Sequence, residues 1–335
     1  MLNVAVTGPT GEIGKPLMAE LERRPEVETV LGMARRPFDP AEEGWEKVSY
    51  RRGDILDRGA LAALFDGVDV AVHLAFAIFG SREETRKVNL QGTRNVFEAA
   101  INAGVTRLVY ASSVAAYGFH PDNPQPLTED VPARGSEGFY YSAQKAELEG
   151  LLDELLLGSS VEAYVFRPCI VAGPRATMLV EQTVDAVRVG DPVPLLRKSV
   201  EKLPLVTPIL PDPGVPMQLV HHDDVARAMA AAICGDGAPG VYNLAGEGEV
   251  RIGDIARALG WRSVPVPRPA VGLGTAAARR LSFASTRLEW ASAADTPVLM
   301  DIAKAERELG WRPRHDAHET LRETVASARE SGLLD

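Results

Sequence analysis

The first half of the chain alternates short apolar runs with amphipathic stretches. Residues 2–7 form an apolar, partly β-branched run followed at once by glycines, which predicts a buried strand. Residues 16–24 carry Leu17, Met18 and Leu21 at helical spacing, with charged residues between them. The same alternation returns in the apolar runs at 27–33, 61–65 and 68–76.

Four longer segments continue this alternation to residue 167. Residues 89–103 and 141–157 have the spacing of helices, whereas 107–112 and 161–167 have that of strands. Strands and helices that alternate at this spacing imply right-handed βαβ crossovers and a parallel sheet covered on both faces. We therefore expect an α/β fold with a Rossmann-type, doubly wound parallel sheet.

The pattern changes after Pro168. Seven prolines between residues 189 and 217 exclude a helix interior or a central strand there. This stretch predicts irregular surface chain that forms a lid or one wall of a cleft, or else a plain linker. Regular elements then resume: we expect helices at 223–234, 252–259 and 302–309, the last closed by Gly310, and a strand at 240–244.

These patterns predict two parts of the chain. The dinucleotide-binding Rossmann domain takes residues 1–167, with later returns near 218–235 and 295–303. A smaller α/β substrate-binding cap, discontinuous in sequence, takes mainly residues 168–217 and 243–335. The signals between 265 and 294 are too weak to predict an element.

Composition narrows the class of protein. The chain has 335 residues, of which 45% are hydrophobic and 24% charged, as in ordinary globular proteins. The net charge of −10 disfavours binding to nucleic acid or to an anionic membrane. The N-terminus lacks the features of a signal peptide, and no apolar run reaches the roughly 18 residues of a spanning helix. We expect a soluble, cytoplasmic protein with a small-molecule substrate.

A glycine-rich turn follows the first expected strand. The segment Thr7-Gly8-Pro9-Thr10-Gly11-Glu12-Ile13-Gly14 leads into the first expected helix. Glycines at this spacing permit a tight turn, close approach of the backbone to a phosphate, and close packing of helix on strand. The helix N-terminus would face a pyrophosphate. A dinucleotide site is favoured here over a merely flexible turn.

Cofactor choice is expected to depend on the end of the second strand. An acid there would bind the ribose of NAD, but the chain has Arg35 and Arg36. Two guanidiniums suit the 2′-phosphate of NADP, although they could also be solvated, or one could stack on the adenine of NAD. NADP(H) is favoured, with NAD(H) as the alternative. Asp54 and Ile55 follow the third strand and could reach the adenine edge, or simply end that strand.

A tyrosine and a lysine share one face of a predicted helix. Tyr141 and Lys145 are four residues apart, and a nearby ammonium favours the phenolate of a tyrosine whose free pKa is about 10. Ser112 and Ser113 end another strand, at the carboxyl edge where doubly wound sheets bind ligands. A hydroxyl there can polarise a carbonyl. A Tyr-x-x-x-Lys alone is usually a surface pair, but the combination is specific.

Together these motifs resemble the extended short-chain dehydrogenase/reductases, in the NAD(P)-dependent epimerase/dehydratase group. The resemblance covers nearly the whole chain. Its matching positions are Thr7–Gly14, Asp54, His73 to Ala75, Asn89, Gly92, Thr93, Ser112, Ser113, Tyr117, Gly118, Tyr141, Lys145, Arg167, Pro168, Gly173, Pro174, Asp223 to Ala226, Tyr242, Asn243 and Leu309 to Trp311.

The resemblance implies roles for individual residues. Ser113, Tyr141 and Lys145 are implied as catalytic, and Asn89 as the support of a local helix distortion or a contact to the cofactor ribose. It also implies a homodimer through 89–103 and 141–157. The residues expected to contact the cofactor are Gly8, Thr10, Gly11, Glu12, Ile13, Gly14, Arg35, Arg36, Asp54, Ile55, Leu74, Ala75, Phe76, Asn89, Ser112, Tyr141, Lys145 and Pro168.

Departures from the family pattern narrow the reaction. Val114 and Ala115 stand where the family's sugar-nucleotide dehydratases carry an acid pair, and no asparagine precedes Gly173-Pro174 to contact a nucleotide diphosphate. We expect an NADP(H)-dependent oxidoreductase for a small or hydrophobic carbonyl compound. The alternatives are a nucleotide-sugar epimerase with tightly bound NAD and, less favoured, a non-catalytic dinucleotide-sensing regulator.

Three histidines are assigned structural roles. His221 and His222 precede two aspartates, but their spacing matches no standard zinc pattern, and we expect no metal site. His73 lies inside an apolar strand, which predicts a hydrogen-bonded core histidine that lines the nicotinamide pocket.

Overall fold

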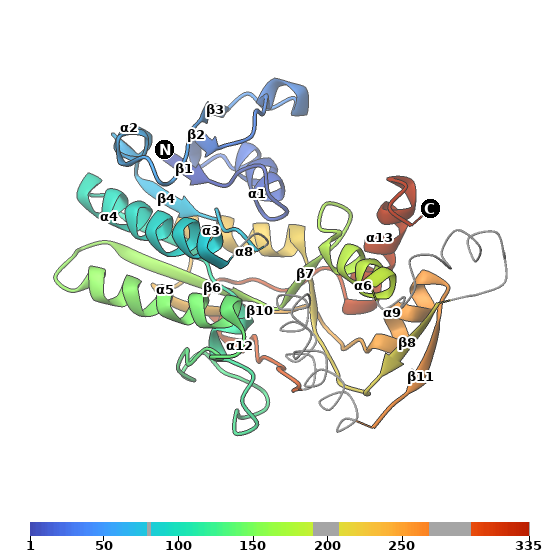
Figure 1. Cartoon of the computed structure of the whole chain (residues 1–335). Helices are drawn as coiled ribbons and strands as arrows, with labels where there is room; N and C mark the ends of the chain where they lie inside the picture. The colour runs from blue at the N-terminus through green and yellow to red at the C-terminus, as the bar shows by residue number, and fades with distance from the viewer. Residues whose placement is uncertain (79–81, 190–207, 268–295, 335) are drawn as a thin grey trace.

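A seven-stranded parallel sheet forms the centre of the computed structural model, which describes residues 1–78, 82–189, 208–267 and 296–334 (Figure 1). Its strand order is β10-β6-β5-β4-β1-β2-β3, and every neighbouring pair is parallel. The Rossmann-type prediction is confirmed. The strands are β1 (Leu2–Thr7), β2 (Val27–Ala34), β3 (Val48–Arg52), β4 (Val70–His73), β5 (Arg107–Ala111), β6 (Glu162–Pro168) and β10 (Gly240–Leu244).

Helices cover both faces of this sheet, as a doubly wound fold requires. Val4 and Val6 of β1 belong to the core on one face, while Ala5 between them belongs to the core on the other. The first core includes α1 (Gly14–Glu22) and α8 (His222–Cys234), which pack together. The second core includes α2 (Arg58–Phe65), α4 (Thr93–Ala103) and α5 (Tyr140–Leu156).

The strand order reverses beside β1, which defines the ligand edge of the sheet. Chain that leaves β1 enters α1 on one face, whereas chain that leaves β4 continues to α4 on the other. The carboxyl ends of β1 and β4 therefore flank the crevice in which doubly wound sheets bind ligands. Short helices lie near it: α3 (Arg82–Arg86), the π-helix η2 (Lys87–Gly92), and the 3-10 helices η1 (Pro40–Glu43) and η3 (Val114–Tyr117).

A smaller group of elements lies to one side of the sheet (Figure 1). β7 (Ile170–Ala172) pairs with β9 (Leu219–His221), and β8 (Ile209–Asp212) pairs with β11 (Arg262–Pro265). Their helices are α6 (Met178–Val189), α9 (Ile252–Leu259) and α13 (Ala317–Glu330), and they share a hydrophobic core of their own. Helix α12 (Ala303–Glu308) does not belong to this group, because it packs on β10 of the large sheet.

The structure differs from the sequence pattern in the second half. β8 contains Pro211 within the stretch expected to be irregular, and an edge position in a two-stranded sheet tolerates this proline. Neither α6 nor α13 was predicted. The expectations for residues 190–207 and 268–295 lie outside the described residues.

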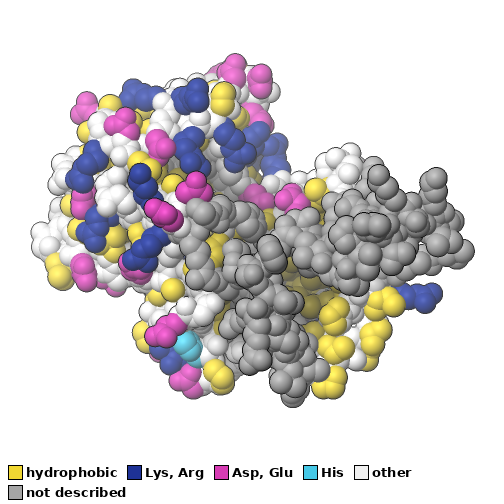
Figure 2. Space-filling view, in the orientation of Figure 1, with side chains coloured by type: hydrophobic (Ala, Val, Ile, Leu, Met, Phe, Trp, Pro, Cys, Tyr) yellow, Lys and Arg dark blue, Asp and Glu magenta, His cyan; other side chains and the backbone are white. Residues whose placement is uncertain are grey.

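The surface carries mixed charge on the side of the large sheet. In Figure 2, basic and acidic side chains intermingle over this part of the visible face, and hydrophobic side chains gather on the smaller part. The smaller part contains two large exposed hydrophobic residues, Ile209 of β8 and Val264 of β11, which are 58% and 48% exposed. No helix within the described ranges is long and apolar enough to cross a membrane.

Candidate active site

The glycine turn after β1 is packed too tightly for side chains at two of its three glycines. Gly8 has a φ of +79°, and a Cβ there would lie 2.7 Å from the Ala75 nitrogen. A Cβ on Gly14 would lie 2.3 Å from the Gly8 oxygen. A Cβ on Gly11 would meet that oxygen at an ordinary 3.5 Å, so protein packing alone does not demand glycine at position 11. Close approach of a ligand to the backbone would require glycine at position 11.

Helix α1 begins directly after this turn. The helix begins at Gly14, its N-cap residue Ile13 provides no side-chain hydrogen bond, and its first turn contains no acid. Uncapped N–H groups at a helix N-terminus bind anions. The residues present therefore fit the pyrophosphate of a dinucleotide.

Glu12 turns away from this turn toward the smaller part of the chain. Its carboxyl accepts a hydrogen bond from the Met178 nitrogen at 3.3 Å, at the start of α6. Burial raises the pKa of Glu12 to about 7. The side chain thus links the glycine turn to α6, and a contact of Glu12 with the cofactor stays a prediction.

Arg35 and Arg36 are exposed just after β2. Their carbonyl groups accept hydrogen bonds from Arg52 and Tyr50, which fixes the backbone but leaves the guanidiniums extended into solvent. Neither guanidinium has an acidic partner among the described residues. Asp54 accepts from the Leu56 nitrogen at 3.0 Å.

Ile55 is buried beside the start of α4. A Cβ on Gly92 would lie 2.5 Å from the Ile55 Cδ1, so glycine at 92 makes room for this side chain. Asn95 donates to the Ile55 carbonyl at 3.2 Å. This packing fixes the loop after β3 against α4, next to the crevice.

The three residues expected to be catalytic come together beyond the end of β5. Ser113 caps η3, accepting from the Ala115 nitrogen at 3.2 Å, and its hydroxyl is hydrogen-bonded to Tyr141. Tyr141 and Lys145 lie one turn apart on α5, and the Lys145 nitrogen is 5.9 Å from the centre of the Tyr141 ring. The structure thus assembles a hydroxyl, a phenol and an ammonium at the ligand edge.

The electrostatics of this group differ in one respect from the expectation. Burial raises the pKa of Tyr141, and the hydrogen bond with Ser113 opposes that rise. Lys145 donates to the Ala111 carbonyl at 2.7 Å, not to the phenol oxygen. In this arrangement Ser113, rather than Lys145, lowers the pKa of the tyrosine.

Lys145 is itself deeply buried, with 3% of its surface exposed. Burial lowers its pKa to about 7, and the carboxylate of Glu149 opposes this effect. Its ammonium lies 4.0 Å from the centre of the Phe76 ring, and Phe76 in turn contacts Tyr141 edge to face at 5.5 Å.

The chain after β4 forms an aromatic wall with the segments around Tyr141. Leu74, Ala75 and Phe76 directly follow β4, and the Leu74 nitrogen donates to the Thr7 carbonyl. Phe139 packs on both Phe119 and Tyr141, at 5.7 and 5.9 Å between ring centres. Pro168 ends β6 beside Leu244. The wall beside the phenol is thus largely apolar.

Asn89 has one of its two expected roles. It is fully buried within the π-helix η2, where it exchanges hydrogen bonds with the Ala77 backbone at 2.8 and 2.9 Å and donates to Gln144 at 2.9 Å. The local helix distortion is confirmed. It ties the chain after β4 to α5, and a contact of Asn89 with the cofactor ribose stays a prediction.

Glu149 was missed by the sequence analysis. It lies on α5 four residues after Lys145, accepts a hydrogen bond from Ser112, and pairs with Arg167 of β6. Glu149 and Arg167 are 6% and 3% exposed. The hydroxyl of Ser112 is thus engaged, so a contact of Ser112 with the cofactor would come from its main chain. The position of Glu149, four residues after Lys145 on the same helix face, was the signal in the sequence that could have identified it.

His73 is a hydrogen-bonded core residue, as expected. Its ring nitrogens lie 2.7 Å from the Thr7 hydroxyl and 2.9 Å from the Thr93 hydroxyl. Burial lowers the pKa of His73 to about 3, so the ring is neutral. It joins β1, β4 and the start of α4 beneath the crevice.

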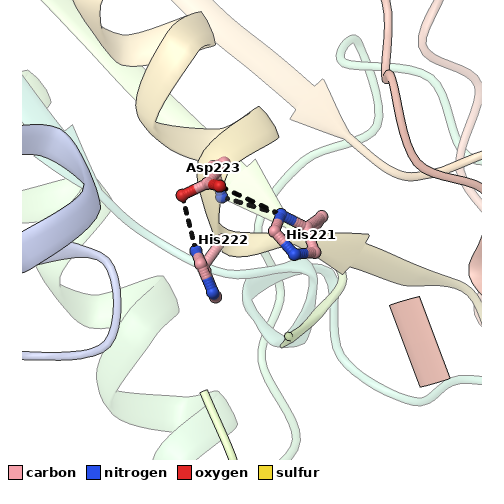
Figure 3. A group of neighbouring side chains, drawn as sticks. All are labelled: His221, His222 and Asp223. Atoms are coloured by element: carbon pink, nitrogen blue, oxygen red, sulfur yellow. Dashed lines mark hydrogen bonds and ion pairs between the residues drawn. The ribbon is translucent and has the colours of Figure 1, made fainter. Parts of the chain in front are cut away.

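His221 and His222 cap and brace the start of α8 (Figure 3). His221 accepts from the Asp223 nitrogen at 3.2 Å, while His222 contacts the Asp223 carboxylate at 2.8 Å and accepts from the Arg175 nitrogen at 3.1 Å. The His221 ring stacks on His315, with 3.9 Å between centres. The possible ligand atoms of His221, His315 and Glu323 lie within 4.8 Å of one another, as do those of His221, His222 and Asp223. The absence of a metal site stays a prediction.

A family model described as the NAD dependent epimerase/dehydratase family matches residues 4–245. The chain belongs to this family. It is an enzyme of the short-chain dehydrogenase/reductase type, in the extended group. The match begins within β1, covers the rest of the large sheet and includes Ser113, Tyr141 and Lys145.

The chain is similar to proteins with several different names. The uncharacterised protein y4nG of Sinorhizobium fredii is 26% identical over 95% of this chain and 76% of its own length. A 3beta-hydroxysteroid-dehydrogenase/decarboxylase of Arabidopsis thaliana is 31% identical over 43% of this chain and 26% of its own. MoeE5, solved with UDP-glucose and NAD, is 23% identical, with a TM-score of 0.71 over 98% of this chain and 99% of its own. The chain spans 30% of the length of several mycobacterial relatives that are 27% identical.

Proposed function

We propose that the chain is an NADP(H)-dependent oxidoreductase that interconverts a small or hydrophobic carbonyl compound and its alcohol. The observation that carries this proposal is the hydrogen-bonded pair of Ser113 and Tyr141, one helical turn from Lys145, at the carboxyl edge of the sheet. A hydroxyl, a phenol and an ammonium are the groups that proton transfer to a carbonyl oxygen requires.

When bound, the nicotinamide supplies or accepts the hydride. Tyr141 donates the proton to the carbonyl oxygen during reduction, and its raised pKa keeps it protonated at neutral pH. Ser113 hydrogen-bonds the same oxygen as negative charge develops on it. Lys145, as the ammonium, supplies positive charge beside the phenol and binds the ribose. Phe76, Phe119 and Phe139 exclude water from this side of the pocket.

Two features support NADP(H) and a hydrophobic substrate. The guanidiniums of Arg35 and Arg36 are exposed where a ribose 2′-phosphate would be bound. The aromatic residues beside Tyr141 favour an apolar substrate. Residues 176–217 and 265–294, in the predicted cap, are proposed to select the substrate.

The second candidate is a nucleotide-sugar epimerase with tightly bound NAD. It is favoured by the likeness in fold to MoeE5, which was solved with UDP-glucose and NAD. An epimerase regenerates its cofactor in every cycle, so it needs none from solution.

One experiment separates the two candidates. The protein is purified, its bound nucleotide is identified after denaturation, and oxidation of added NADPH is followed with a panel of aliphatic, alicyclic and aryl ketones. The oxidoreductase predicts protein without bound NAD and ketone-dependent consumption of NADPH. Stoichiometric bound NAD, with no consumption of NADPH by any ketone, would overturn the proposal in favour of the epimerase.

A further inference from the structure

Three consecutive residues at the end of β5 are hydrogen-bonded to three residues on one face of α5. The Ala111 carbonyl accepts from Lys145, Ser112 donates to Glu149, and Ser113 is hydrogen-bonded to Tyr141. Positions 141, 145 and 149 are each one turn apart, so their side chains share a helix face. The contacts of Lys145 and Tyr141 with the end of β5 are thus accompanied by a third, buried contact, that of Glu149 with Ser112.

We propose that Glu149 is a positioning residue, whose carboxylate fixes α5 on the end of β5 and holds Lys145 as the ammonium ion. This inference rests on the proposed function for its effect on turnover. Its effect on Lys145 is a property of the folded protein and can be measured without any substrate.

The position of the Glu149 carboxylate is defined by three elements. Ser112 donates to it from the end of β5, and Arg167 of β6 binds both of its oxygens, with Nε at 3.1 and 3.2 Å. Arg167 is itself fixed, because its guanidinium lies 4.2 Å from the centre of the Tyr117 ring and donates to the Val131 carbonyl. A buried carboxylate with these partners has little freedom to move.

The other titratable groups that face Lys145 are uncharged. His73 of β4 is neutral because burial lowers its pKa to about 3, and burial raises the pKa of Tyr110 of β5 and of Tyr141. Glu149 is thus the one charged side chain, within the described part of the chain, that is found to act on the pKa of Lys145.

The groups around Glu149 leave its charge in place. Arg167 forms an ion pair with it and so keeps it ionised, and Asp153, one turn further along α5, has its pKa raised by burial and by Glu149. Burial alone drives a lysine toward its neutral form. A fixed carboxylate one turn away opposes that tendency, which is what a group that must stay charged in an apolar pocket requires.

The test is the protonation midpoint of Lys145, measured by NMR. The chain has seven lysines, so their ¹³Cε signals can be followed individually through a pH titration and Lys145 assigned with Lys145→Arg. We expect Glu149→Gln to move the midpoint of Lys145 to lower pH by about one unit. Glu147→Gln is the matched control, because Glu147 lies on the same helix with its side chain 52% exposed, and it is expected to leave the midpoint unchanged.

Two further variants keep the proposal falsifiable. Ser112→Ala removes the hydrogen bond and keeps the charge, so the midpoint should stay within about 0.3 units of the wild-type value. If Glu149→Gln does not fold, Glu149→Gln with Arg167→Met removes both buried charges, and the same direction of shift is expected. An unchanged midpoint in the folded Glu149 variant, or an equal shift in Ser112→Ala, would overturn the proposal.

The kinetic measurement separates this inference from the proposed function. With a ketone and NADPH, Glu149→Gln should lower kcat at pH 7 about fivefold, with little change in KM, and should shift the basic limb of the pH profile together with the NMR midpoint. If the wild-type protein reduces no carbonyl compound, the proposed function fails, and the NMR titration still decides the effect of Glu149 on Lys145.

Discussion

The ammonium of Lys145 lies on the ring of Phe76, 4.0 Å from its centre. This contact removes water from one side of the charge and replaces it with the negative face of an aromatic ring. Phe76 also meets the edge of Tyr141. One side chain thus helps to bury both Lys145 and Tyr141, and burial lowers the pKa of the lysine and raises that of the tyrosine.

The rate of carbonyl reduction should therefore fall above about pH 7. Lys145 loses its proton as the pH rises through its pKa of about 7, whereas Tyr141, with a raised pKa, stays protonated. The rate should fall about tenfold per pH unit above that point. Lys145→Arg keeps the positive charge and should retain activity to higher pH. A basic limb above pH 9 in the wild-type enzyme would contradict this assignment.

Acid should destabilise the fold through His73. Its pKa is about 3 when folded and 6.5 when unfolded, so the unfolded chain binds a proton first as the pH falls below 6.5. The free energy of unfolding should lose about 1.4 kcal/mol per pH unit from this residue between pH 6 and 4. The comparison is urea unfolding of wild type and His73→Gln. Parallel pH dependence in the two proteins would exclude His73 as the source.

Two alanine substitutions in the glycine turn should have different effects. Gly14→Ala places a Cβ against the Gly8 oxygen and should cost about 2–3 kcal/mol of stability. Gly11→Ala meets ordinary contacts within the protein and should fold normally, but should weaken binding of the dinucleotide about tenfold or more. Thermal unfolding and cofactor titration measure the two effects. Normal cofactor affinity in Gly11→Ala would show that the pyrophosphate does not bind next to residue 11.

The two exposed arginines after β2 should set the choice of cofactor. Replacing both Arg35 and Arg36 with serine should weaken NADPH binding about 10- to 100-fold and leave NADH binding nearly unchanged. Arg23→Ser is the control, since Arg23 is also exposed but lies at the end of α1, paired with Glu20. Equal losses for both cofactors would indicate a general role of the two arginines, not recognition of the 2′-phosphate.

The large sheet was predictable because its signals are local. The apolar run at β1, the glycines behind it and the repeated strand–helix spacing each depend on a few neighbouring residues, and β1, β10 and α9 have the expected bounds. The smaller part was less predictable because its strands are short: β7 and β9 have three residues each, and β8 and β11 have four. So few residues show no clear alternation of apolar and polar positions.

At the candidate site, too, the relationships between neighbouring residues were predictable and the contacts between distant residues were not. The spacing of Tyr141 and Lys145 follows from helix geometry, and so does the shared face of Glu149. The local sequence does not show which side chains from other elements contact that face. Arg167 is 18 residues beyond Glu149, and Phe76 is 69 residues before Lys145, yet they determine where the charges lie.

The proposed carbonyl reduction depends most directly on the phenol of Tyr141. The measurement is the rate of NADPH oxidation with the best ketone substrate, together with the Kd for NADPH, for wild type and Tyr141→Phe. The account predicts a loss of at least about 10³-fold in kcat with a Kd within about threefold of the wild-type value. A Tyr141→Phe enzyme that retains the wild-type rate would contradict it.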